Sequence, residues 1–97
     1  MIVRADLPRG IQAANIVHAA GESSPGNLPR GTYAVCLVTP GEPALRGLAE
    51  RLTALGVPHV EIHESDEPYS GQLMAVGLKP ARKEDVRRLL SSLPLLR

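Results

Sequence analysis

Runs of apolar residues in this chain alternate with Gly- and Pro-rich turns, and their spacing predicts both strands and helices. Short apolar runs predict strands over residues 1–6, 32–39, 57–63 and 72–78. Apolar residues three and four positions apart predict helices over residues 10–21, 43–55 and 80–91. The order strand, helix, strand, helix, strand, strand, helix indicates an α/β fold, with a four-stranded mixed sheet as the middle layer of a three-layer α/β/α arrangement.

The first predicted helix combines a narrow apolar face with a polar stripe. The apolar face would consist of Ala13, Ile16, Val17 and Ala20, and the opposite side would carry Asn15, His18 and Glu22. An amide, an imidazole and a carboxylate in one stripe are typical either of a functional site or of a solvated helix surface.

Composition narrows the classes of protein that this chain can represent. Its 97 residues suit one domain, over residues 1–97, and the net charge of +1 lacks the basic excess typical of general nucleic-acid binding. A single cysteine, Cys36, cannot form an internal disulfide, which favours a cytoplasmic location. No apolar stretch approaches the ~18 residues of a membrane span, and we expect no secretory signal and no membrane partner. The sequence also allows a homodimer.

His18 is a candidate general base because an imidazole titrates near neutrality. A carboxylate from Glu22 on the same helix, or from Glu64 or Asp66 in the acidic loop that follows the third strand, would orient it. Exposed amides from Gly10 to Gln12 at the helix N-terminus would suit a phosphate or an oxyanion, with Arg9, Arg4 or Arg30 meeting phosphate charge. We expect no metal site, because His59 and His63 together with His18 do not have the spacing of metal ligands.

Two further features allow a contact with nucleic acid. Arg82, Lys83, Arg87 and Arg88 form the one basic cluster, which is either a solvated helix face or a contact with a nucleic-acid backbone. Tyr69 in the acidic loop could stack on one terminal base.

The first strand and helix resemble the signature of the type 2 peptidyl-tRNA hydrolases. The matching residues are Asp6-Leu7, then Gly10, then Ala13-Ala14-Asn15-Ile16-Val17-His18-Ala19. A second match follows the acidic turn at Glu64 to Asp66, in Gly71-Gln72-Leu73-Met74-Ala75-Val76-Gly77. The Leu-Pro-x-Gly start of the helix and the terminal Ser-Leu-Pro-Leu are similar to those of a small, divergent bacterial branch of that family.

This resemblance implies a compact α/β fold and hydrolysis of the ester between a peptide and the 3′ end of tRNA, without metal or cofactor. It places Asn15 where the family has a glutamine, Glu64 or Asp66 at its acidic position, and Gln72 where it has a threonine. It also places Ile11 where the family has a lysine, so that Arg9 would have to supply the charge. We therefore expect His18, Asn15, Glu64 and Asp66 to be catalytic, and Arg9, Gly10, Glu22 and Gln72 to bind substrate.

Two other functions remain open. The loss of the lysine at Ile11 favours a catalytically inactive binding module on the same fold. The low net charge favours an esterase that acts on a small substrate other than RNA.

Overall fold

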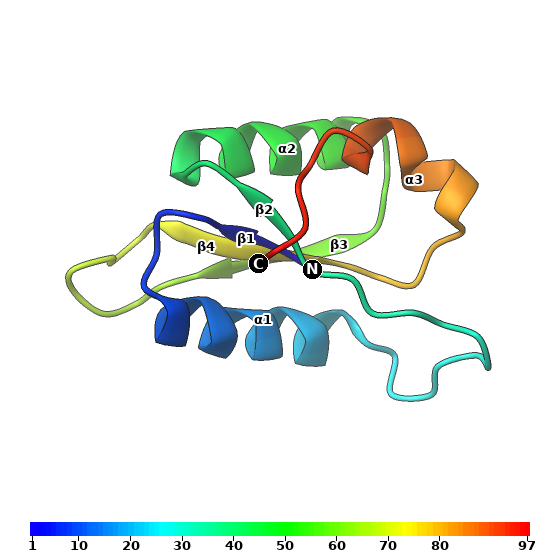
Figure 1. Ribbon diagram of the computed structural model, residues 1–97, viewed down its shortest axis with the longest axis horizontal. Coiled ribbons are helices and arrows are strands. Elements are labelled where there is room, and N and C mark those ends of the chain that lie inside the picture. Colours follow the sequence, from blue (N-terminus) through cyan, green and yellow to red (C-terminus); the bar gives the residue numbers. More distant parts are fainter.

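The computed structural model describes residues 1–97 and shows an α/β protein built on a four-stranded mixed sheet, as the sequence predicts. Its elements are β1 (Ile2–Arg4), α1 (Arg9–Ser23), β2 (Leu37–Thr39), α2 (Glu42–Ala54), β3 (His59–His63), β4 (Leu73–Leu78) and α3 (Lys83–Leu90). Figure 1 shows α1 on one face of the sheet and α2 with α3 on the other. None of these helices is both long and apolar enough to cross a bilayer.

The strands lie in the order β2-β1-β4-β3. β1 pairs in parallel with β2 and antiparallel with β4, which also pairs antiparallel with β3. The C-terminal segment covers the outer edge of β2, because the N–H of Val38 donates to Pro94 O and the N–H of Leu96 donates to Cys36 O, both at 2.9 Å.

Each face of the sheet has its own apolar core. Beneath α2 and α3 the buried residues are Ile2, Leu45, Leu48, Ala49, Leu52, Leu73, Val76 and Leu89. Beneath α1 they are Val3, Leu7, Ala19, Ile62, Met74 and Ala75. Alternation along β1 sends Ile2 to one core and Val3 to the other, as the period of a strand requires.

The second strand is much shorter than the sequence predicts. Residues 32–36 lie outside the sheet, and Tyr33 is 87% exposed. The reason is the length of its partner: β1 pairs only Ile2 to Arg4 with Leu37 to Thr39, so the residues before Leu37 have almost no strand to pair with. Apolar, β-branched composition alone therefore overestimated this strand.

The predicted orientation of α1 is wrong. The residues that it buries are Gln12, Asn15, Ala19 and Ser23, whereas Val17 is 70% exposed. This face is selected by a close approach to β4, since a Cβ on Gly77 would lie 2.5 Å from Ala19 O. Small and polar side chains fit there, and the amide of Gln12 is satisfied because it donates to Arg4 O at 2.9 Å.

Candidate active site at the Arg4 end of the sheet

Arg4, the last residue of β1, is the centre of a polar cluster at one end of the sheet. Its side chain is only 6% exposed, and it donates to both carboxylate oxygens of Asp6, from Nε at 3.0 Å and from Nη2 at 2.8 Å. Nη1 donates to Gln72 Oε1 at 2.7 Å. Arg4 therefore joins two segments that lie 66 residues apart in the sequence.

The guanidinium is almost fully used by these bonds, so Arg4 holds its neighbours in place instead of binding an anion itself. Arginine has no acceptor, so the carbonyl oxygen of the Gln72 amide must face it. The NH₂ group of Gln72 has no partner within the protein and is free to donate. The Asp6 carboxylate is 45% exposed and is free to accept from a ligand or a water.

Charge stabilises the ionised forms of this pair. The hydrogen bonds from Arg4 are the main cause that lowers the pKa of Asp6 below its usual range. The same bonds raise the pKa of Arg4. Asp6 is therefore a carboxylate at neutral pH, suited to orienting a water molecule.

A hydrogen bond from the backbone of β4 to a carboxylate of α2 holds the start of β4 against that helix. Glu42 accepts from the Leu73 N–H at 2.9 Å and from Arg46 Nη2 at 2.8 Å. The Leu73 N–H is the main cause that lowers the pKa of Glu42, and Arg46 adds to it. Because Leu73 follows Gln72, this contact fixes the backbone next to the Gln72 side chain.

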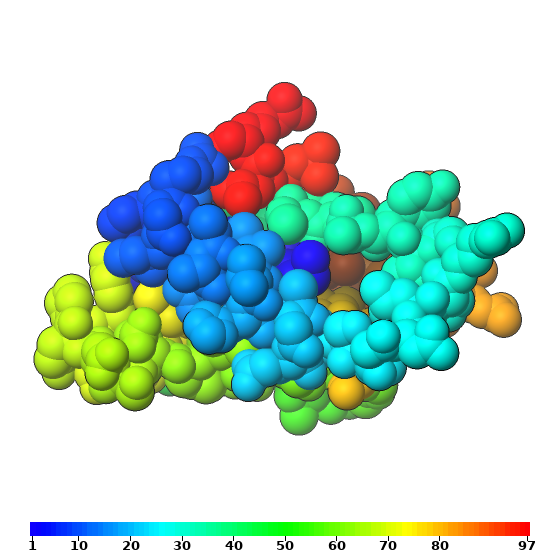
Figure 2. All heavy atoms as spheres, turned by 90° about the horizontal axis from the view of Figure 1, so that it is seen from below, coloured from blue at the N-terminus to red at the C-terminus, as the bar shows by residue number.

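The first turn of α1 lies at the same end of the molecule. Pro8 caps the helix without a side-chain hydrogen bond, and the first turn contains no acidic residue. Gln12 is the first residue of α1 whose N–H donates within the helix, to Pro8 O, so the N–H groups of Arg9, Gly10 and Ile11 have no partner in the helix. Arg9 and Gly10 are exposed and Ile11 is half-buried. In Figure 2 the start of α1 lies at the same end as loop 64–72, while residues 24–36 extend beyond the other end of the helix. These donors suit an oxyanion or a phosphate.

The predicted catalytic residues are not brought together: apart from a hydrogen bond between Asp66 and Glu64 within the acidic loop, no hydrogen bond or ion pair joins them. His18 and Glu22 are exposed on α1 and have no hydrogen bond or ion pair. Asn15 is 6% exposed and its amide donates to Ile11 O, within its own helix, at 2.9 Å. The expected stripe of Asn15, His18 and Glu22 is thus divided between a buried and an exposed face.

The acidic loop stabilises its own turn. Glu64 Oε1 accepts from the N–H groups of Ser65 at 2.9 Å and Asp66 at 3.2 Å. The Asp66 side chain is exposed and has no cationic partner. From the same loop, Tyr69 places its ring centroid 5.9 Å from the Arg4 guanidinium, within the range of a cation–π contact. Of the predicted substrate-binding residues, Gln72 belongs to the Arg4 cluster, and Arg9 and Gly10 are exposed in the first turn of α1.

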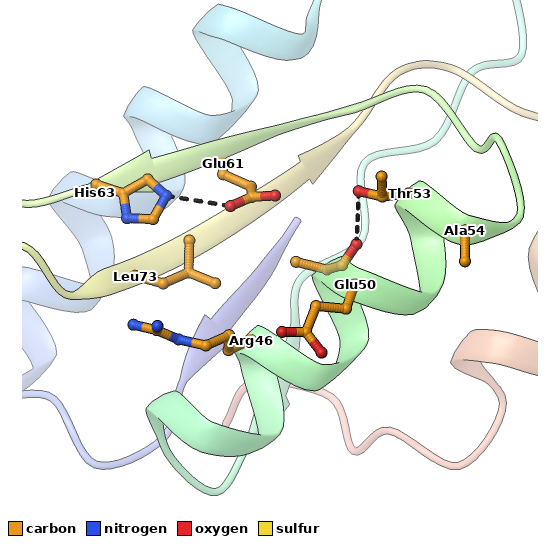
Figure 3. A pocket seen from close by; sticks show the side chains of 8 residues that line it. Arg46, Glu50, Thr53, Ala54, Glu61, His63 and Leu73 are labelled. Carbon is orange, nitrogen blue, oxygen red and sulfur yellow. Dashed lines mark hydrogen bonds and ion pairs between the residues drawn. The ribbon is translucent and has the colours of Figure 1, made fainter.

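A groove of about 410 Å³ lies between α2 and β3, and its lining includes Leu73, whose carbonyl oxygen accepts from Arg4 Nη1 at 3.4 Å. Figure 3 shows His63 and Glu61 from β3 and Glu50 and Thr53 from α2 along it. Glu61 accepts from His63 Nε2 at 3.1 Å and lies 3.5 Å from His59 Nε2. No group of three or more His, Cys, Asp or Glu side chains is arranged to hold a metal ion.

The sequence reasoning missed the central role of Arg4 and Asp6, although a signal was present. Residues i and i+2 of a strand lie on the same side. An Arg-x-Asp spacing at the end of a short strand therefore predicts an ion pair beside the following turn. The signal was overlooked because Arg4 was weighed only as a charge for phosphate.

No family model matches this chain, and no curated protein matches it. The resemblance to the type 2 peptidyl-tRNA hydrolases therefore stays a prediction, carried by the short motifs that contain Asp6 and Gln72.

Proposed function

We propose that this protein hydrolyses the ester that joins a peptide to the terminal ribose of tRNA, and that it does so at the Arg4 end of the sheet. The observation that carries the proposal is the Arg4 bridge. The two segments that resemble the hydrolase signatures each contribute one side chain, Asp6 and Gln72, to the same guanidinium.

Hydrolysis of an ester needs a positioned water and donors for the oxyanion that forms on the carbonyl oxygen. In the proposed reaction Asp6 accepts a hydrogen bond from the attacking water and orients it. The free NH₂ group of Gln72 donates to the developing oxyanion, and the N–H groups of Gly10 and Ile11 offer further donors. The water forms the new C–O bond and releases a proton to solvent, the bond to the ribose oxygen breaks, and that oxygen takes a proton from solvent.

The neighbouring groove supports a substrate that extends beyond the ester. Leu73 lies in its lining beside the cluster. Thr53, whose hydroxyl donates to Ala49 O, can accept a hydrogen bond from a peptide N–H, and the N–H groups of Arg46 that do not bind Glu42 can donate to a peptide carbonyl. Under this proposal the peptide lies along the groove and the ribose lies near the first turn of α1.

His18 has no part in this step, because it has no partner that would orient it. This differs from the interpretation of the sequence, in which His18 is the base. The two assignments make opposite predictions for the same variant, so His18→Ala is the natural control.

The test is the release of N-acetyl amino acid from N-acetyl-aminoacyl-tRNA. We expect turnover by the wild-type protein, a fall in kcat of about a hundredfold in Gln72→Ala, the size found when one oxyanion donor is lost, and less than a twofold change in His18→Ala. Circular dichroism would show that both variants fold. A hundredfold loss in His18→Ala with full activity in Gln72→Ala would refute this site.

A binding module without catalysis is the second candidate, and Ile11 is the observation that favours it. A lysine at that position would add a charge to the helix N-terminus, whereas Ile11 adds none. No turnover by a folded wild-type protein that still binds tRNA would support this candidate. Turnover of a small N-acetyl amino acid ester alone would instead support an esterase with a different substrate.

A further inference from the structure

The charges of this protein are separated along its length. Glu61, Glu64, Asp66 and Glu67 lie close together in a stretch that contains no Lys or Arg. After position 78 the chain carries Lys79, Arg82, Lys83, Arg87, Arg88 and Arg97 against only Glu84 and Asp85. Figure 1 places the acidic loop 64–72 and helix α3 at opposite ends of the molecule, whose longest dimension is 38 Å. The net charge is only +1, but the molecule has one basic end and one acidic end.

The basic side chains of α3 are unpaired and exposed. Leu89 anchors the helix in the core beneath α2, with Leu90 packed beside it. Every Lys and Arg between positions 79 and 88 is exposed, and none forms an ion pair. The helix is thus held in place by its apolar face, and its cationic side chains are exposed to solvent.

Helix stability does not explain the cations at the start of α3. Arg87 and Arg88 lie in the last turn, where the helix dipole favours positive charge. Arg82 is the N-cap and Lys83 is the first helical residue, where the dipole disfavours positive charge and where Ser, Thr, Asp or Asn would cap better. Arg82 makes no capping hydrogen bond. Residues that break a local rule without a local gain point to a function.

We propose that α3 binds the sugar–phosphate backbone of the RNA whose ester is hydrolysed at the other end of the molecule. The identification of the partner as RNA rests on the proposed function, whereas the basic surface of α3 is observed independently of it. The acidic loop repels phosphates near the Arg4 cluster, so duplex RNA is drawn to α3, and the unpaired 3′ nucleotides extend from there toward the ester site. The substrate is oriented by this charge separation before it docks.

The test uses Arg82→Ser with Lys83→Glu, a double variant that improves both the cap and the dipole interaction of α3. Its unfolding midpoint should equal or exceed that of the wild type, so weaker binding cannot come from a damaged fold. The control is Arg51→Glu with Arg97→Ser, which changes the net charge by the same amount at two exposed arginines outside α3. Fluorescently labelled, deacylated tRNA is titrated with each protein from 50 to about 200 mM salt, the range over which phosphate contacts are resolved.

We expect the α3 variant to bind tRNA at least tenfold more weakly, and its slope of log K against log salt to fall by about 2, as for two lost phosphate contacts. The control should lose much less affinity for tRNA.

Kinetics provide a second readout. With N-acetyl-aminoacyl-tRNA as the substrate, the KM of the α3 variant should rise and its kcat should stay constant. With N-acetyl-aminoacyl-adenosine, which has no duplex, neither should change. Equal losses in variant and control, or unchanged binding in both, would overturn the role of α3. A protein that binds tRNA through α3 but hydrolyses neither ester would overturn the proposed function alone.

Discussion

Replacing Asp6 by Asn should destabilise the protein by about 2 kcal/mol, because it leaves the buried guanidinium of Arg4 without its counter-charge. Hydrogen bonds to charged groups contribute about 1.5–3 kcal/mol each, and Arg4 makes two of them to Asp6. The sum is reduced because Asp6 is 45% exposed, where solvent screens the pair, and because Asn keeps one acceptor.

The assay is urea unfolding followed by far-ultraviolet circular dichroism at pH 7. With an m-value near 1.5 kcal/mol/M, the expected loss lowers the midpoint by about 1.3 M. Asp66→Asn is the matched control, because Asp66 is an exposed carboxylate without a cationic partner, and its midpoint should stay within about 0.3 M of the wild type.

The pH dependence provides an independent check. The pKa of Asp6 is lower in the folded than in the unfolded protein, so its contribution is complete above the unfolded value of about 3.9 and is lost as the pH falls through the folded value. The difference between wild type and Asp6→Asn should therefore be constant from pH 5 to 7 and shrink below pH 4. A difference under about 0.5 kcal/mol at pH 7, or one that persists unchanged at pH 2, would refute the reasoning.

Three further substitutions test the packing. Gly77→Ala should cost about 1–3 kcal/mol by overpacking, since its Cβ would lie 2.5 Å from Ala19 O, and a wild-type urea midpoint would show that α1 does not approach β4 so closely. Leu52→Ala, in the core beneath α2, should cost about 2–5 kcal/mol in the same assay, and a loss below 1 kcal/mol would mean that this core is loosely packed. Thr39→Val should stabilise by about 1 kcal/mol because the buried Thr39 hydroxyl has no hydrogen-bond partner, and destabilisation would reveal a partner.

The fold class followed from the sequence because apolar spacing was clear in most elements. Of the stripe that spacing predicts on α2, Leu45, Leu48, Ala49 and Leu52 are buried, whereas Leu55, which follows the last helical residue, is 65% exposed. The predicted buried face of α1 is wrong for a physical reason. The close approach of Ala19 to Gly77 decides which face is buried, and hydrophobicity does not encode that approach. The buried face follows helical spacing all the same, at Gln12, Asn15, Ala19 and Ser23. A search for apolar residues alone does not find it, because three of these four side chains are polar.

The candidate site was only partly predictable. Gln72 was selected by the resemblance, and it is in the cluster. Its partner Arg4 lies 68 residues away in the sequence. A local sequence pattern does not predict which distant acceptor will bind an arginine on a strand. The role of His18 as the base stays a prediction, because the identity of a residue does not supply the partner that orients it.

The most direct test of the central claim is the kcat of Gln72→Glu on N-acetyl-aminoacyl-tRNA. Glutamate keeps an acceptor for Arg4 and so preserves the bridge, but it replaces the NH₂ donor by a carboxylate oxygen. We expect a folded protein whose unfolding midpoint is at least that of the wild type and whose kcat is lower by about a hundredfold or more. A folded Gln72→Glu variant with wild-type kcat would contradict the assignment of the active site to the Arg4 cluster.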